Sequence, residues 1–137
     1  MSENISAGFI IFRKRKNIEY LLLRRSNDNI WDFPKGRFKE KESELDGAVR
    51  ELYEETEINK IKIYNFRHEL EFINTASIYR KIILFLAQTD QEPKLSKEHK
   101  DFIWSNYKKT INLIYFKERK EAIKKAHKYL LENLIQP

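Results

Sequence analysis

Three glutamates stand at the spacing of a single helix face, because Glu51, Glu54 and Glu55 occupy positions i, i+3 and i+4. Like charges at this spacing destabilise a helix unless something neutralises them. A hard divalent cation held by carboxylate oxygens would do so, which makes a metal site the chemical hypothesis. The alternative is a solvated acidic face on a surface helix. That simpler interpretation is favoured for the three glutamates taken alone. The residues around them favour the metal site instead.

The surrounding residues predict the helix that must position these glutamates. Ser43 is a suitable N-cap, and acidic residues follow it in the first turn. Leu45, Val49 and Leu52 recur at helical spacing behind it. Residues 43–56 are therefore expected to form a helix.

A longer pattern includes this helix and resembles the signature of the Nudix hydrolases. It consists of a glycine, five residues, a glutamate, seven residues and a charged run, here Gly36, Glu42 and Arg50-Glu51-Leu52-Tyr53-Glu54-Glu55. The resemblance implies cleavage of nucleoside diphosphates linked to another moiety, with Mg²⁺ or Mn²⁺ as the cofactor. It also implies that the metal is held by Glu51, Glu54, Glu55 and the carbonyl oxygen of Gly36.

Two positions depart from that signature. Glu57 stands where a glycine is expected just before the closing aliphatic residue, Ile58, at a place where helices commonly end in a left-handed residue. Lys41 replaces a glycine often found just before Glu42. Both changes affect loop geometry and leave every carboxylate in place.

Further residues of the pattern have supporting roles in this hypothesis. Arg50 can donate charge-assisted hydrogen bonds that orient Glu51, and we include it among the catalytic residues. Glu42 is placed to interact with the metal site or with Arg50, and spacing does not decide which. Lys35 could reach a phosphate as a point charge, whereas the alternative is an ordinary loop lysine. Beside it, Gly36 can take a conformation that aims its carbonyl at a metal.

A second set of segments is similar to the asymmetrically cleaving diadenosine tetraphosphate hydrolases, a branch of the same family. The segments are Phe66-Arg67-His68-Glu69-Leu70, Leu95-Ser96-Lys97-Glu98-His99 with Trp104, Phe116-Lys117-Glu118, and the earlier Trp31 and Pro34-Lys35-Gly36. Together they cover nearly the whole chain, although each is a weak motif alone. This resemblance implies cleavage of a dinucleoside polyphosphate, diadenosine tetraphosphate, to ATP and AMP by attack of water on a phosphoryl group.

Glu98 is the most informative residue of this second set. The resemblance implies that it acts at the metal site, as a further ligand or as the base, and we place it with Glu55 among the catalytic residues. Attack on a phosphoryl group needs an oriented water, and glutamates on one helix face cannot surround a cluster of ions. Its loop should fold over the helix toward Glu51 and Glu55, and charge repulsion should hold it loosely until metal and substrate bind. The alternative is a solvated loop glutamate.

Substrate contacts are expected on two other segments. Base stacking on an aromatic ring is the usual mode, and we select Phe116 among four candidates, the others being Tyr79, Phe85 and Tyr115. By the resemblance, Arg80 or Lys81 could supply a phosphate contact from the strand expected at residues 78–89.

Other activities could use the same residues. Removal of pyrophosphate from RNA 5′ ends and hydrolysis of diphosphoinositol polyphosphates are the nearest alternatives. A Nudix-fold binding module that has lost catalysis is a different class, and the intact glutamates argue against it. A generic acidic-helix protein without metal chemistry is the least supported.

Composition sets the outer limits of these hypotheses. The length suits one domain, residues 1–137, and the lack of cysteine excludes disulfides and cysteine zinc sites. The formal net charge is +6 although the candidate site is acidic, so positive charge lies elsewhere and suits a polyanionic ligand. No apolar run approaches the roughly 18 residues of a membrane span. We expect a cytoplasmic monomer with a small-molecule nucleotide substrate, no membrane association and no stable nucleic-acid partner.

The remaining pattern predicts an α/β (α+β) fold. Strands are expected as two hairpins, residues 5–13 with 18–24 and residues 61–74 with 78–89, and as a short strand at 102–104. Helical segments are expected at residues 107–115 and at the C-terminus, where one stripe carries Ile123, Ala126, Leu130, Leu131 and Leu134. The resemblance implies a Nudix-type α/β/α sandwich, with a mixed β-sheet between the 43–56 helix and the C-terminal helix and residues 36–42 as a loop.

Overall fold

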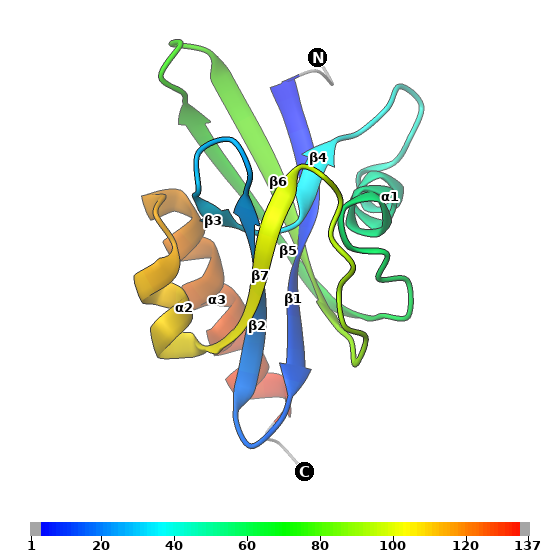
Figure 1. Cartoon of the computed structure of the whole chain (residues 1–137), viewed down its shortest axis with the longest axis vertical. Coiled ribbons are helices and arrows are strands. Elements are labelled where there is room, and N and C mark those ends of the chain that lie inside the picture. The colour runs from blue at the N-terminus through cyan, green and yellow to red at the C-terminus, as the bar shows by residue number, and fades with distance from the viewer. Residues whose placement is uncertain (1–3, 135–137) are drawn as a thin grey trace.

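The computed structural model describes residues 4–134, and Figure 1 shows their arrangement. In chain order the strands are β1 (Ile5–Lys14), β2 (Ile18–Arg25), β3 (Trp31–Asp32), β4 (Lys35–Arg37), β5 (Lys62–Ile73), β6 (Tyr79–Gln88) and β7 (His99–Asn106). The helices are α1 (Glu44–Thr56), between β4 and β5, and α2 (Tyr107–Leu113) and α3 (Lys117–Leu134), which follow β7.

The strands of this described part form one mixed sheet. Its central path is β3-β2-β1-β6-β5, with β4 paired to β1 and β7 paired to β2. The β1–β6 pair is parallel, with Phe9 opposite Phe85, and the other pairs are antiparallel. This confirms the mixed sheet that the sequence predicts.

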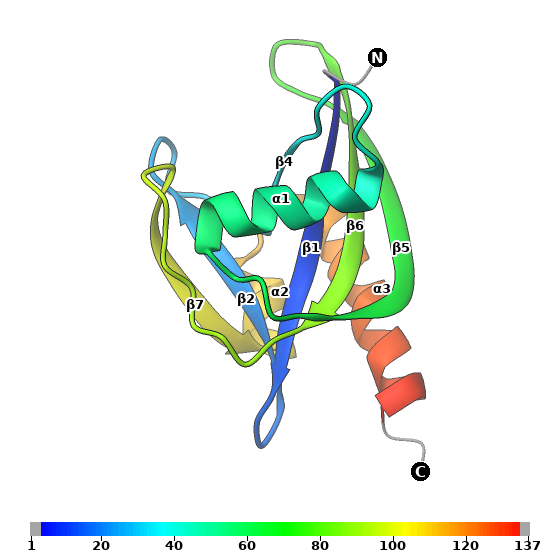
Figure 2. The same cartoon turned by 90° about the vertical axis from the view of Figure 1, so that its right-hand side faces the viewer.

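Alternation along the central strands divides the core into two layers. Ile10 and Phe12 of β1 face one cluster, while Phe9 and Ile11 face the other. The apolar stripe of α3 covers the first cluster, and Leu52 of α1 packs into the second. Figure 1 shows α1 on one side of the sheet and α2 and α3 on the other, and Figure 2 shows α1 lying across the sheet face. The predicted α/β/α sandwich is confirmed.

Three details of the predicted elements were wrong. The loop expected at residues 36–42 begins later, because Gly36 and Arg37 lie within β4. The strand expected at 102–104 spans all of β7, because it pairs along the whole of β2. Leu131 of the expected apolar stripe is exposed, whereas Ile123 and Leu130 are fully buried.

The pairing of β4 with β1 explains a glycine inside β1. Gly8 lies opposite Lys35, and a side chain there would overlap the carbonyl oxygen of Pro34 and the Cβ of Lys35. A glycine inside a strand is typical of a bulge or of a close backbone approach, and at Gly8 the structure shows the close approach. This contact fixes the segment that leads into α1.

Candidate active site

Local sequence determines where α1 begins and ends. The Ser43 hydroxyl accepts a hydrogen bond from the Asp46 backbone N–H at 3.0 Å, which caps the N-terminus. At the C-terminus Glu57 adopts the left-handed conformation, φ 59°, and its N–H donates to the Tyr53 carbonyl. Lys41, just ahead of the helix, also has a positive φ of 68°. Both positions therefore keep the backbone conformation that a glycine would favour, although each carries a side chain.

Arg50 holds the acidic face of α1 in place. Its Nε and Nη2 donate to both carboxylate oxygens of Glu42 at 2.7 and 3.0 Å. Its Nη1 donates to Glu51 and Glu54, each at 2.9 Å, and Nη2 also donates to the Arg37 carbonyl at 3.0 Å. Hydrogen bonds from Arg50 lower the pKa of Glu42 to about 2. Arg50 is thus saturated by protein acceptors and acts on Glu51 by orienting it.

Gly36 provides the space that Glu51 occupies. A Cβ at Gly36 would overlap the carboxylate of Glu51, so a larger residue here would displace that carboxylate from its position between β4 and α1. The φ of Gly36 is not positive, so close approach, rather than an unusual backbone conformation, requires the glycine. That its carbonyl is a metal ligand stays a prediction.

Glu55 is a buried carboxylate at the base of a cavity. It is 4% exposed, and one oxygen accepts a hydrogen bond from the Lys35 backbone N–H at 3.2 Å. Burial raises its pKa to about 8, and the neighbouring charge of Glu51 adds to the rise. A cation beside it would favour the charged form. Glu54 lies differently, because its side chain is 51% exposed and ion-paired to Arg50 at the rim.

The segment before β7 brings Glu98 to this carboxylate. Ligand atoms of Glu55, Glu98 and His99 all lie within 4.8 Å of one another. The segment is tied to the end of α1, since Ser96 donates its backbone N–H to the Glu55 carbonyl at 3.1 Å and Lys94 donates to the next carbonyl at 2.8 Å. These bonds satisfy helix-terminal carbonyls and argue against the loosely held loop that we expected.

His99 is the residue of this cluster that the sequence argument missed. Its Nδ1 is buried and has no hydrogen-bond partner among the described residues. Burial lowers the pKa of His99 from 6.5, which favours the neutral imidazole that can bind a metal. Its position directly after Glu98 was the available signal.

The residues present fit a divalent cation. Carboxylate oxygens of Glu55 and Glu98 suit Mg²⁺ or Mn²⁺, and the unpartnered Nδ1 of His99 adds a nitrogen more typical of Mn²⁺. Glu51, whose carboxylate accepts a hydrogen bond from Arg50, is not part of this group. Burial is the largest cause that raises the pKa of Glu51 and of Glu55. The like charges of Glu54 and Glu98 add to the rise for Glu51, and those of Glu51 and Glu98 add to the rise for Glu55. A cation would relieve this repulsion.

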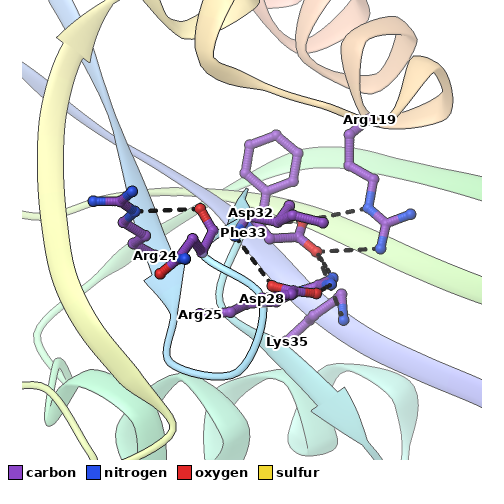
Figure 3. A network of polar contacts seen from close by, with 9 residues as sticks. Arg24, Arg25, Asp28, Asp32, Phe33, Lys35 and Arg119 are labelled. Atoms are coloured by element: carbon purple, nitrogen blue, oxygen red, sulfur yellow. Dashed lines mark hydrogen bonds and ion pairs between the residues drawn. The ribbon is translucent and has the colours of Figure 1, made fainter.

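Glu55, Glu98 and His99 form an acidic cluster. Beside this cluster, three cationic side chains surround one buried carboxylate, Asp32. Asp32 is 2% exposed, and it forms ion pairs with Arg25, with Arg119 at 3.2 Å and with Lys35 at 3.9 Å. Although burial opposes it, these charges lower the pKa of Asp32. Figure 3 shows the three cationic side chains directed at Asp32 from different elements, while Arg24 lies on the other side of β2.

Two adjoining cavities connect these groups. The first, about 410 Å³, is lined by Glu55, Glu98 and His99 at the acidic cluster. The second, about 880 Å³, runs between the β5–β6 hairpin and the segment ahead of α3. Arg25, Asn27 and Lys35 line both cavities, so the cationic side chains stand where the two meet.

The larger cavity also contains the predicted substrate contacts. Phe116, Tyr115, Arg80 and Lys81 line it together with Arg119. Phe116 meets Tyr115 edge-on, with ring centroids 5.2 Å apart, and the Arg119 guanidinium lies 4.4 Å from its ring. Lys81 is ion-paired to Glu69 at 3.2 Å.

Two of the aromatic candidates do not lie in this cavity. Phe85 packs in the core against Phe9, with ring centroids 5.9 Å apart. Tyr79 is exposed and is not among the residues that line the cavity.

Arg25, Asp32 and Arg119 were not identified from the sequence. Arg119 carried a signal, because it extends the stripe of Ala122, Ile123 and Ala126 at helical spacing and is only 3% exposed. A charged residue on the buried face of a helix needs a partner.

Within residues 4–134, no helix has the length and apolarity that a membrane crossing requires.

Comparisons with known proteins agree with this geometry. Residues 3–129 match the model of the NUDIX domain family. An asymmetrical bis(5′-nucleosyl)-tetraphosphatase of Sus scrofa is 34% identical over 139 residues, which cover 91% of this chain and 94% of that protein. A dihydroneopterin triphosphate diphosphatase of Haemophilus influenzae is 29% identical and covers 89% of this chain and 86% of its own length.

A solved structure has the same architecture. An Ap4A hydrolase of Caenorhabditis elegans, crystallised as a binary complex, superposes with a TM-score of 0.88 at 27% sequence identity. The superposition covers 93% of this chain and 98% of that one.

Proposed function

Because this chain belongs to the Nudix hydrolase family, we propose that it hydrolyses a dinucleoside tetraphosphate asymmetrically, to a nucleoside triphosphate and a nucleoside monophosphate. Diadenosine tetraphosphate, giving ATP and AMP, is the proposed substrate. The cofactor in this proposal is Mg²⁺ or Mn²⁺, held by Glu51, Glu55 and Glu98, with Glu54, the Gly36 carbonyl and His99 as further candidate ligands.

The observation that carries the proposal is the position of Glu98. It comes from a segment remote from α1 in sequence, yet its carboxylate lies beside Glu55 within 4.8 Å. The cavity that contains both shares Arg25, Asn27 and Lys35 with the larger cavity lined by cations and aromatic rings. An acidic end and a cationic, aromatic-lined end suit a ligand with a phosphate chain between metal and base.

The chain's own residues have separate roles in the proposed hydrolysis. A bound divalent ion would supply charge stabilisation for the phosphoryl oxygens. Arg50 keeps Glu51 oriented, and Glu55 or Glu98 accepts the proton of the attacking water. Burial raises the pKa of the Glu55 carboxyl, and a bound cation would favour its charged form, which is the form that can accept a proton.

The remaining contacts would hold the substrate. Lys35 and either Arg80 or Lys81 offer positive charge to the phosphates, and each lines the larger cavity. Phe116, with Tyr115 edge-on to it, offers a ring on which a purine can stack. This stacking needs no base-specific hydrogen bond, so it tolerates more than one purine.

Product analysis tests the proposal directly. The full chain is incubated with Mg²⁺ or Mn²⁺ and diadenosine tetraphosphate, and nucleotides are separated by anion-exchange chromatography. Equal amounts of ATP and AMP are expected, whereas ADP as the sole product would mean symmetrical cleavage. Glu55→Gln is the control for a contaminating activity, because it should abolish the products while the protein stays folded.

A substrate panel tests the alternatives. It includes diadenosine triphosphate, 5′-triphosphorylated RNA, a diphosphoinositol polyphosphate, oxidised dGTP and dihydroneopterin triphosphate. The last is included because a relative at 29% identity carries that activity in its name. A kcat/KM for any of these above that for diadenosine tetraphosphate would overturn the proposed substrate.

A further inference from the structure

Three cationic side chains share one buried carboxylate in the cluster around Asp32. Arg25, Lys35 and Arg119 surround a single fully buried carboxylate, so these four residues have a net charge of about +2. Two carboxylates outside these four residues offset part of the charge, because Asp28, at the exposed rim, pairs with Arg25 at 3.1 Å and Glu55 interacts with Lys35. Buried charges are usually matched one to one, so three cations that share one buried carboxylate require an explanation.

The cluster also has more hydrogen-bond donors than acceptors. Arg119 uses Nε and Nη2 on Asp32 at 3.3 and 3.2 Å, and its buried Nη1 has no partner among the described residues. Lys35 approaches Asp32 only to 3.9 Å, which is an ion-pair distance and not a hydrogen bond. An anion with several oxygens would match these donors better than the protein does.

The three cationic side chains lie where the two cavities meet. Arg25 and Lys35 line both the cavity of the acidic cluster and the larger aromatic cavity, and Arg119 lines the larger one. Arg25 is also opposite His99 in the β2–β7 register, next to the candidate metal ligands. A phosphate chain that joins a metal-bound phosphoryl group to a base on Phe116 must pass this point.

We propose that Arg25 is a phosphate-binding residue of this cleft and that the buried Asp32 carboxylate is the positioning residue that holds Arg25, Lys35 and Arg119 in place. Arg25 meets Asp28 with Nη1 and Asp32 with Nη2, so its guanidinium is fixed without being enclosed, and its side chain remains 23% exposed. The inference rests on the proposed function, since it names a phosphate chain as the ligand.

A matched pair of variants tests Arg25. Arg24 is the adjacent arginine on β2, but it stacks over Trp31 and lines neither cavity. Arg25→Gln and Arg24→Gln therefore change the net charge equally, and only the first removes the proposed contact. Inorganic tripolyphosphate is titrated into the full-length chain in EDTA, so that binding does not depend on a metal ion.

Arg25→Gln is expected to weaken tripolyphosphate binding about tenfold or more, because a charge-assisted hydrogen bond is lost. Arg24→Gln is expected to weaken it by less than about twofold. In turnover assays Arg25→Gln should raise KM for the dinucleoside tetraphosphate with little change in kcat, and Arg25→Lys should recover part of the loss. Equal effects of the two glutamine variants, or no tripolyphosphate binding by the unmodified chain, would overturn the inference.

Asp32→Asn separates positioning from charge alone. The substitution makes the cluster more positive, so if only net charge mattered, the affinity for tripolyphosphate would rise. If Asp32 positions the cations, the affinity falls despite the added charge, and this is the expected result. Circular dichroism verifies the fold of this variant, and the Arg25 pair decides the question if Asp32→Asn does not fold.

The two proposals fail separately. A chain that binds tripolyphosphate through Arg25 but does not cleave dinucleoside tetraphosphates would refute the proposed function and leave this site in place. Asymmetrical cleavage that Arg25→Gln leaves unchanged in KM would refute the site and leave the function.

Discussion

The two left-handed residues that flank α1 make a quantitative prediction about stability. Lys41 and Glu57 have φ values of 68° and 59° and are both exposed. A side chain in this conformation costs about 1–2 kcal/mol relative to glycine. Glycine in turn adds about 0.4–1 kcal/mol of conformational entropy to the unfolded chain, which opposes the gain. Each of Lys41→Gly and Glu57→Gly should therefore raise the free energy of unfolding by about 0.5–1 kcal/mol.

The two effects should add. The sites lie at opposite ends of a 13-residue helix, about 20 Å apart, and share no contact that would couple them. The double variant should gain about 1–2 kcal/mol, which corresponds to a rise of about 3–7 °C in Tm for a domain of this size. Glu57→Gly also removes a negative charge from the C-terminal end of α1, which favours the helix dipole.

Urea denaturation followed by circular dichroism measures these changes. Glu40→Gly is the control, because Glu40 is exposed on the same loop and does not have a positive φ. This control should lose about 0.4–1 kcal/mol through the unfolded-state term alone. If Lys41→Gly and Glu57→Gly are destabilised as much as Glu40→Gly, the left-handed conformations do not carry the strain assigned to them.

Three further predictions concern the site and the pH dependence of stability. Glu55→Gln and Glu98→Gln should each lower kcat by about 10²-fold or more with a much smaller change in nucleotide affinity, measured by steady-state kinetics and calorimetry; near-normal turnover would remove that residue from the mechanism. Gly36→Ala should displace the Glu51 carboxylate and weaken Mn²⁺ binding, measured by electron paramagnetic resonance, and an unchanged affinity would contradict the steric role of Gly36. Burial lowers the pKa of His127 from 6.5, so the folded state prefers the neutral ring and the unfolding free energy should fall as pH drops below about 6.5, less steeply in His127→Gln.

The sequence by itself determined helix α1. Ser43 caps it, Leu52 repeats at helical spacing toward the core, and Glu51 and Glu55 are placed on one face by a period of 3.6 residues. These features depend on neighbours within a few residues, and the chain therefore encodes them locally. The strands were predictable for the same reason, since the alternation of buried side chains in β1 is a local pattern.

The resemblance to known enzymes added what local pattern could not, namely that Glu98 belongs with the glutamates of α1. From residue types alone, a glutamate in a polar loop is a solvated side chain. Its location beside Glu55 depends on the hydrogen bonds from Ser96 and Lys94 to the end of α1. Such contacts between distant segments leave no periodic pattern in the sequence.

Only the tertiary structure assembled the cluster around Asp32. Arg119 contacts Asp32 across 87 positions of sequence, whereas Arg25 reaches Asp32 across the β2–β3 pair. The register of β2 with β7 then places Arg25 opposite His99. Sheet register and helix docking are set by the packing of the whole core, so the position of a side chain at their junction cannot be derived from its neighbours in the chain. The identity of the cations that face the cleft therefore depends on the tertiary structure, in which Arg25, Lys35 and Arg119 surround the buried carboxylate of Asp32.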